Sequence, residues 1–305
     1  MFDLFGFTIK RSFLIEGGNM SKTTRRDFFI QTGKSAALLT IGSTLSKCAQ
    51  PGESASGSGD EKLKRLELGM ASYTFRKFSL EDTLAMTQRL GLQHIALKSF
   101  HLPLDADEAT IQAVAARVKA AGLDLYGGGV IYMKNKEEVD RAFMYARTAG
   151  MKVIIGVPEP DLLELVHQKV QEYNIKLAIH NHGPGDQRYP TPESAYEKIK
   201  DMDSRMGLCI DIGHTRRAGI DPANDAEKYA ARLHDVHIKD VNVADKTGTT
   251  VEIGRGVIDI PKFLRTLIKI NYQGNVSLEF EKDAENPLAG AAESIGYIRG
   301  VLSVI

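Results

Sequence analysis

The feature that most constrains the fold is a strict alternation of short apolar runs with longer amphipathic runs, starting at Leu66. The short runs have the length of buried strands, and the longer runs have the spacing of helices with one apolar face. This order predicts parallel strands joined by helical crossovers, and eight such units close into a (β/α)₈ TIM barrel. The expected strands cover residues 66–74, 93–100, 123–131, 152–158, 175–182, 206–213, 233–240 and 275–281.

Capping residues mark where the intervening helices begin and end. Ser79 and Thr191 stand where N-caps are expected. Gly91, Gly122 and Gly150 follow three helices, at the position where a left-handed C-cap favours glycine. The expected helices cover residues 80–90, 109–121, 136–148, 162–173, 192–202, 226–233, 260–270 and 288–302.

Residues 1–48 have the pattern of an export signal. The pair Arg25-Arg26 precedes two aromatic residues, and a weakly apolar stretch follows at 35–41. This order resembles a twin-arginine signal, and the alternative is a short amphipathic surface helix. Met20 stands directly ahead of the pattern, so we expect translation to start there. The predicted location is therefore outside the cytoplasm, in the periplasm or at a membrane.

Cys48 closes the apolar region in a sequence that partly resembles a lipoprotein cleavage box, although Lys47 occupies a position where a small residue is usual. The sequence leaves lipidation of Cys48 open. Residues 49–63 are small and polar and are expected to form a flexible linker. Residues 64–305 then form a single catalytic barrel domain of the usual size. Cys209 is the only other cysteine, so the chain cannot build an internal disulfide framework.

Charge and hydropathy exclude two classes of partner. The chain has 39 basic and 39 acidic residues, and a nucleic-acid-binding protein usually carries a basic surplus. Its apolar runs are also shorter than the roughly 18–20 residues that span a bilayer. We therefore expect no nucleic-acid partner and no transmembrane span. The sequence leaves the oligomeric state open.

Polar residues recur at one parity near the ends of four consecutive strands. Alternate strand residues face opposite sides, and the outward set here is apolar, as in Leu208, Ile210 and Ile212. The inward set carries polar groups at the end where barrel enzymes hold their chemistry. These groups are His180, Asp211, His237 and Glu279.

Two imidazoles and two carboxylates at one point form a ligand set for a divalent cation. Mixed nitrogen and oxygen donors suit Mn²⁺, Zn²⁺, Co²⁺ or Fe²⁺ better than Mg²⁺, which prefers oxygen alone. A lone histidine is usually a hydrogen-bonded structural group. Four residues that share one parity and one barrel end favour a metal site.

At these residues the chain resembles the xylose isomerase-like sugar isomerase/epimerase superfamily, over residues 66–305. The resemblance rests on three segments: residues 207–214 (Gly-Leu-Cys-Ile-Asp-Ile-Gly-His), 237–240 (His-Ile-Lys-Asp) and 277–281 (Ser-Leu-Glu-Phe-Glu). It implies that Asp211, His237 and Glu279 are metal ligands. It also implies that His214 contacts substrate hydroxyls.

One departure from the family pattern concerns the fifth strand, where many epimerases carry Glu-Asn-His. This chain has His180-Asn181-His182. A two-base epimerase needs carboxylates on both faces of one carbon, so His180 keeps a ligand but weakens that scheme. Glu159 is the residue expected to supply the missing carboxylate, and its alternative is a solvated loop acid.

Several further residues are expected around the pocket. Lys98 shares the inward parity of its strand and can stabilise an enolate, or it can be an ion-pair partner inside the barrel. Arg217 is expected either to bind substrate oxygens or to brace Asp221. The other predicted substrate contacts are His101, His182, Lys239 and Tyr73.

The resemblance implies a metal-dependent carbohydrate isomerase or epimerase. Proton abstraction beside a carbonyl forms an enediolate, with Glu279 or Glu159 as the base and with His214 and Lys98 assisting. The expected substrate is an unphosphorylated sugar or keto-sugar, because sugar phosphates are largely cytoplasmic. The alternatives are a lyase or dehydratase that eliminates the aglycone from 3-keto-glycosides, and a non-catalytic sugar-binding lipoprotein.

Overall fold

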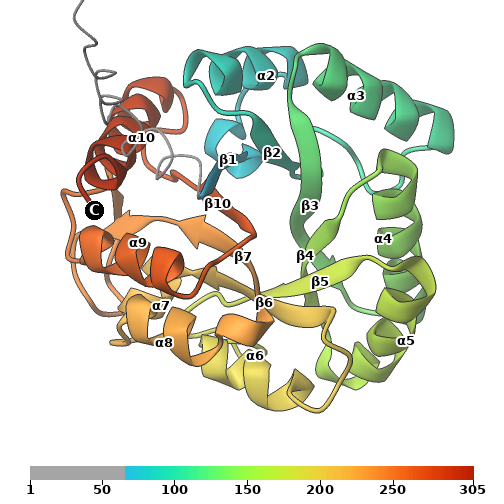
Figure 1. The fold of residues 1–305 in the computed structure, drawn as a ribbon. Coiled ribbons are helices and arrows are strands. Elements are labelled where there is room, and N and C mark those ends of the chain that lie inside the picture. The colour runs from blue at the N-terminus through green and yellow to red at the C-terminus, as the bar shows by residue number, and fades with distance from the viewer. Residues whose placement is uncertain (1–65) are drawn as a thin grey trace, which may run out of the picture. The chain divides into compact units, whose positions relative to one another are not determined.

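The computed structural model describes residues 66–305, which form a closed barrel of parallel strands (Figure 1). The barrel order is β1-β10-β7-β6-β5-β4-β3-β2, and β1 pairs with both β2 and β10 to close it. The predicted fold class is therefore confirmed. The strands are β1 Glu67–Ala71, β2 His94–Leu97, β3 Asp124–Met133, β4 Val153–Pro158, β5 Lys176–His180, β6 Met206–Asp211, β7 Leu233–Ile238 and β10 Asn275–Leu278.

Helices form a ring outside the barrel (Figure 1). Short 3₁₀ turns follow β1, β4 and α8 at Ser72–Phe75, Pro160–Leu162 and Ala230–Arg232. The α-helices are α2 Leu80–Arg89, α3 Glu108–Ala120, α4 Lys136–Ala149, α5 Leu163–Tyr173, α6 Pro192–Ile199, α7 Ile212–Arg217, α8 Pro222–Lys228, α9 Ile260–Lys269 and α10 Leu288–Leu302.

The predicted helix ends are borne out where the sequence carried a cap. The side chain of Ser79 accepts a hydrogen bond from the Asp82 amide, and Thr191 and Ser194 form a reciprocal capping box. Gly150 adopts φ 72°, which a residue with a Cβ adopts only with strain. These local signals fix where α2, α6 and α4 begin or end.

Several boundaries differ from the prediction, and most expected strands end earlier than predicted. The strand expected at 66–74 ends at Ala71, and the strand expected at 206–213 ends at Asp211, because Asp211 caps α7. The helix expected at 226–233 begins at Pro222, with Asp221 as its N-cap. A small antiparallel sheet was not predicted at all; it pairs β8 (Asp240–Val241) with β9 (Thr250–Val251).

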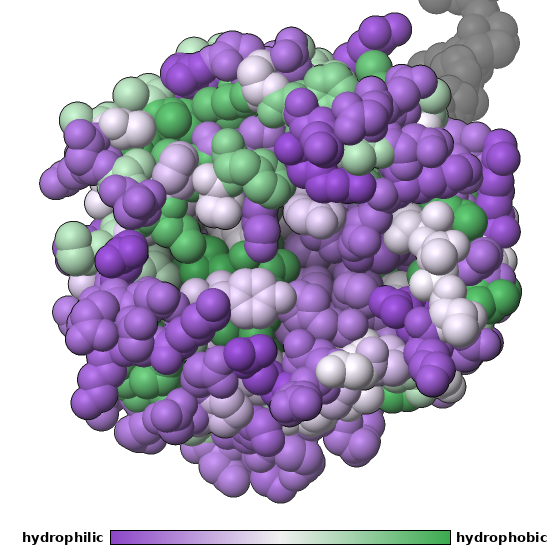
Figure 2. All heavy atoms as spheres, turned by 180° about the vertical axis from the view of Figure 1, so that it is seen from behind, coloured by the Kyte–Doolittle hydropathy of each residue, from purple (hydrophilic) through white to green (hydrophobic). Residues whose placement is uncertain are grey.

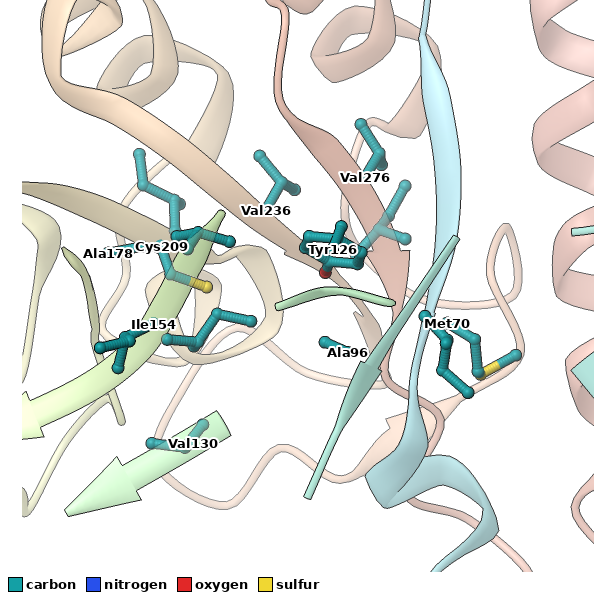
Figure 3. Close-up of a cluster of buried hydrophobic side chains, with 14 of the residues drawn as sticks. Met70, Ala96, Tyr126, Val130, Ile154, Ala178, Cys209, Val236 and Val276 are labelled. Atoms are coloured by element: carbon teal, nitrogen blue, oxygen red, sulfur yellow. The ribbon is translucent and has the colours of Figure 1, made fainter. Parts of the chain in front are cut away.

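The core fills the barrel and the layer between the strands and the helices. Buried side chains such as Met70, Tyr126 and Cys209 gather there from separate strands (Figure 3). Viewed from behind Figure 1, hydrophilic residues surround a hollow near the centre of the molecule (Figure 2). Because the barrel interior is packed with side chains, the catalytic residues of such a fold lie at the carboxyl ends of the strands.

The described part of the chain contains no helix long and apolar enough to cross a membrane. The predicted export signal (1–48), the possible lipid site at Cys48 and the linker (49–63) lie outside the described residues. The expectations for these segments stay predictions.

Candidate functional site

The structure brings together the four side chains that strand parity predicted. His180 ends β5, Asp211 ends β6, His237 lies on β7, and Glu279 directly follows β10. One nitrogen or oxygen atom from each side chain lies within 4.8 Å of the others, and all four residues are buried. Strands far apart in sequence thus deliver one compact donor set.

The spacing of these atoms fits a divalent ion. His180 Nε2 lies 3.1 Å from His237 Nδ1 and 3.5 Å from Asp211 Oδ2, and His237 Nδ1 lies 3.4 Å from Glu279 Oε2. Ligands bound at about 2.0–2.2 Å around a tetrahedral ion lie roughly 3.3–3.6 Å from each other. Asp211 Oδ2 is buried and forms no well-aligned hydrogen bond with the described residues, although the Lys239 ammonium lies 3.0 Å away. The set therefore fits a divalent metal, and its identity is open.

The protonation states of His180 and Asp211 suit metal binding, since ligands must be deprotonated. Burial is the main cause that lowers the pKa of His180 to about 3, so its imidazole is neutral. Burial opposes the ionised form of Asp211, but the charges of His214 and Lys239 outweigh it and hold the Asp211 pKa well below its usual value. A neutral imidazole beside an ionised carboxylate is the form that coordinates a cation.

Local structure orients Asp211 for this purpose. Its Oδ1 accepts the His214 amide at 2.7 Å as the N-cap of α7, which leaves Oδ2 for the cluster. Its own amide donates to Asn181 Oδ1 at 3.1 Å, and Asn181 in turn donates to Thr215. Asn181 is a supporting residue to which the sequence analysis assigned no role. Its position between His180 and His182 was the available signal.

Lys239, which the sequence predicted as a substrate contact, places its ammonium between the carboxylates of the cluster. Its side chain is 2% exposed, with Nζ 3.0 Å from Asp211 Oδ2 and 2.8 Å from Glu279 Oε2. It also donates to Glu281, a carboxylate to which the sequence analysis gave no role despite its inward parity. The Lys239 ammonium therefore contacts three carboxylates at the barrel mouth and offsets part of their negative charge. This pairing lowers the cost of burying the charges.

A pocket of about 480 Å³ opens beside this cluster. His214, Arg217 and Lys239 line it, together with Glu281 and the 248–251 segment. The Arg217 guanidinium donates to His214 Nδ1 at 3.1 Å, so Nε2 carries the hydrogen of the neutral ring. Burial is the main cause that lowers the His214 pKa to about 4. His214 can therefore donate a hydrogen bond from Nε2.

The other side of the mouth carries Lys98, Tyr132 and His182. Lys98 Nζ donates to the Val130 carbonyl and lies 5.8 Å from the Tyr132 ring centroid. Burial lowers the Lys98 pKa, while the Glu279 charge opposes that shift. His182 Nε2 lies 3.1 Å from the Tyr132 hydroxyl, and burial is the main cause that lowers the His182 pKa to about 4.

Aromatic surface lies next to Lys98. Phe100 is 46% exposed, and its ring centroid is 6.0 Å from that of Tyr73. Tyr132 is 39% exposed. Exposed aromatic faces beside polar groups form the kind of surface against which ligands pack. The predicted substrate contact of Tyr73 stays a prediction.

Two predicted residues are committed to other partners. His101 is buried, and its ring nitrogens lie 2.9 Å from Ser72 Oγ and 3.1 Å from Thr83 Oγ1, so the predicted pocket role of His101 does not fit its contacts. Glu159 accepts from Arg188 Nε at 2.7 Å and is not one of the four clustered donors. The bond from Arg188 is the main cause that lowers the Glu159 pKa, which makes it a weaker base.

Comparison with known proteins supports the fold assignment. The family model described as a xylose isomerase-like TIM barrel matches residues 161–301, which include all four clustered donors. The fold is that of a xylose isomerase-like TIM barrel. An inosose dehydratase of Glaesserella parasuis is 33% identical over 154 residues, which cover 44% of this chain and 51% of that protein.

A second inosose dehydratase, from Geobacillus thermodenitrificans, is 25% identical over 72% of this chain and 80% of its own length. The chain thus matches about half of the first relative's length and more of this one's. Among solved structures, the IOLI protein with a bound zinc atom has a TM-score of 0.66 at 17% identity, covering 78% of this chain and 98% of that one. A 3-keto-D-glucoside 4-epimerase from E. coli has a TM-score of 0.63 at 17% identity, covering 77% and 99%.

Proposed function

We propose that the protein is a divalent-metal-dependent lyase that acts on an unphosphorylated keto-sugar. It abstracts a proton from the carbon next to the carbonyl (the α carbon) and eliminates the substituent on the β carbon. The observation that carries the proposal is the buried donor set of His180, Asp211, His237 and Glu279 next to an open polar pocket. When bound there, a metal supplies Lewis-acid stabilisation of the negative charge that develops on the carbonyl oxygen. Sequence similarity to two inosose dehydratases agrees with an elimination.

The chain's own residues suit a one-base elimination better than a two-base epimerisation. Glu279 is ionised and held by Lys239, and no hydrogen bond from the described residues reaches its Oε1. That oxygen is available to accept the proton from carbon. A two-base scheme needs a second carboxylate on the opposite face of the substrate carbon, and this chain has His180 at that position. Glu159, the other acid considered for this role, is bound to Arg188.

The elimination needs a proton donor for the leaving oxygen. As the C–H bond breaks, its electron pair forms the C=C bond, and the C–O bond to the leaving group breaks. The leaving oxygen takes a proton and departs as water or as an alcohol. Lys98 and His214 lie on opposite sides of the mouth, and the orientation of the bound substrate decides which of the two donates this proton.

An epimerase is the second candidate, and Glu281 favours it. This carboxylate lines the pocket, contacts Lys239 and is 35% exposed on its side chain, so it can reach a substrate carbon. A carboxylate at that position restores a second base.

One pair of measurements separates the two reactions. The metal-loaded protein is incubated with 3-keto-glucosides in deuterium oxide, and both released aglycone and deuterium in the recovered sugar are measured. The lyase proposal expects aglycone release with a matching unsaturated keto-sugar. Deuterium incorporation without bond cleavage would support epimerisation. A protein that binds no transition metal in elemental analysis would contradict both.

A further inference from the structure

A buried carboxylate that the proposed reaction does not use lies directly beneath the metal-competent residues. Asp235 stands two residues before His237 on β7, pairs in register with Cys209 on β6, and is 0% exposed. Both side chains face the barrel interior, since residues two apart on a strand share a face. Asp235 is therefore part of the packed interior and not of the pocket.

The Asp235 carboxylate has few polar contacts. Its Oδ2 accepts a hydrogen bond from Cys209 Sγ at 3.4 Å and lies 3.7 Å from His237 Nε2, and its Oδ1 accepts no hydrogen bond from the described residues. A buried carboxylate with so few hydrogen bonds destabilises the fold, so its position indicates a role other than packing.

His237 is the basic side chain paired with this carboxylate. His237 Nε2 lies 3.7 Å from Asp235 Oδ2, and Nε2 has no hydrogen-bond partner among the described residues. The second ring nitrogen, Nδ1, is the one that faces His180 and Glu279. The two nitrogens of His237 thus face two different environments.

We propose that Asp235 is a positioning residue of the metal centre: its buried carboxylate holds the hydrogen of His237 on Nε2 and leaves the Nδ1 lone pair aimed at the donor set. At 3.7 Å in the buried interior, the attraction between a carboxylate and an N–H is strong enough to select one tautomer. Histidines that bind metals are generally oriented in this way by an acceptor behind the ring. The inference rests on the metal centre of the proposed function but not on the reaction assigned to it.

Asp235→Asn tests this inference, because asparagine keeps the size of the side chain and removes its charge. Affinity for Zn²⁺ and for Mn²⁺ is measured on the full chain by competition with a chromophoric chelator. The Co²⁺ absorption spectrum reports coordination geometry, and thermal melting of the metal-free protein at pH 8 reports stability. Ser277→Ala is the matched control, since Ser277 is equally buried and its side chain bonds to Tyr126 at 2.6 Å. Ser277 pairs with His237 through the β-sheet ladder, but its side chain is not one of the clustered donors.

The variant is expected to lose about 10–100-fold in metal affinity, with a changed Co²⁺ spectrum. Its metal-free form is expected to melt at a higher temperature than the native chain, because burying a neutral amide costs less than burying a carboxylate with few hydrogen bonds. A residue with a purely structural role would, when replaced, lower both the metal affinity and the melting temperature of the metal-free protein. If Ser277→Ala lowers metal affinity, its melting temperature is expected to fall as well. Native metal affinity in Asp235→Asn would overturn the inference.

A second variant guards against misfolding. Asp235→Ser leaves room for a water molecule, and near-ultraviolet circular dichroism checks its packing; it is expected to show the same loss of affinity. Weakened metal binding in both variants supports the inference even when the native protein releases no aglycone, in which case the proposed reaction alone has failed.

Discussion

Glu279 combines two charged contacts with near-complete burial. Its Oε2 faces His237 and accepts a hydrogen bond from Lys239, while its side chain is almost fully buried. Burial opposes ionisation, but the charges of Lys239 and His237 outweigh it and hold the Glu279 pKa well below its usual value. The carboxylate is thus kept charged in a place where charge is costly, which is typical of a functional site.

Glu279→Gln is expected to lower turnover by about 10²–10⁴-fold, because the amide cannot accept the proton from carbon. The barrel should stay folded, since glutamine has nearly the same shape. Steady-state kinetics on the metal-loaded protein and circular dichroism check the two expectations. Glu285→Gln is the matched control, as Glu285 is exposed on the same loop and pairs only with Lys77. Near-native turnover in Glu279→Gln would remove this residue from the role of base.

Asp225 gives a prediction on pH dependence away from the site. It is 9% exposed on α8, and burial is the main cause that raises its pKa from 3.8 to about 6. The unfolded chain therefore releases this proton first as pH rises. The contribution of protonated Asp225 to the free energy of unfolding is therefore fully present below about pH 4 and is lost as the pH rises through about 6.

Asp225→Asn imitates the protonated form, so it should raise the free energy of unfolding at pH 8 by about 1–3 kcal/mol and change it little near pH 4. Urea unfolding at both pH values measures the difference. Glu227→Gln, an exposed site on the same helix, should change stability little at either pH. An equal effect of Asp225→Asn at both pH values would contradict the assigned pKa shift.

The clustered side chains were predictable because strand alternation is a local property. Knowing the parity of β5, β6 and β7 was enough to place His180, Asp211 and His237 on one side. Glu159 was not predictable in the same way, since its partner Arg188 lies 29 residues away in a segment without periodicity. His101 likewise bonds to Ser72, and only the closed barrel brings the two together.

At the scale of elements, the segment between β7 and α9 is organised by one carboxylate. Asp240 is fully buried, and its Oδ1 accepts the amides of Val241 and Ile258 at 2.9 and 3.2 Å. Its Oδ2 accepts those of Gly254 and Gly256 at 2.9 and 3.0 Å. One side chain therefore replaces the backbone pairing that this segment lacks.

Asp240→Ala is expected to cost about 2–4 kcal/mol, since hydrogen bonds to a charged acceptor are strong and four amides lose theirs. Because this segment forms one wall of the pocket, limited proteolysis should also cut within 241–258. Asp245→Ala removes a carboxylate that is exposed in the same segment and bonds only to Thr247, and it should leave both stability and cleavage near native. Unchanged proteolysis of Asp240→Ala would show that other contacts hold the segment.

Periodicity predicted the regular elements and missed the irregular ones. The eight strands were found because each is a short apolar run between helical patterns. The start of α8 was missed although Asp221-Pro222 is a clear capping signal, because apolar spacing was weighed above it. The β8–β9 pair has two residues per strand, too few for any period to be recognised.

At the scale of the whole molecule, the two ends of the barrel differ in chemistry. A cavity of about 730 Å³ lies at the amino ends of the strands, lined by Glu67, His94, Lys176 and others. The pocket beside the metal-competent residues is smaller, at about 480 Å³. Cavity size alone would point to the wrong end. The converging donors identify the carboxyl end, where TIM barrels hold their active sites.

Export remains a proposal about the whole chain, because its signal lies outside the described residues. If Arg25 and Arg26 are recognised as a pair, replacing both with lysine keeps the charge but should stop export of the folded protein. Cell fractionation with immunoblotting measures this, as the precursor should accumulate in the cytoplasm. Arg65→Lys makes the same chemical change after the signal and should be exported normally. Unchanged export of the Arg25→Lys/Arg26→Lys chain would contradict the twin-arginine proposal, and the case for an unphosphorylated substrate would lose its support from location.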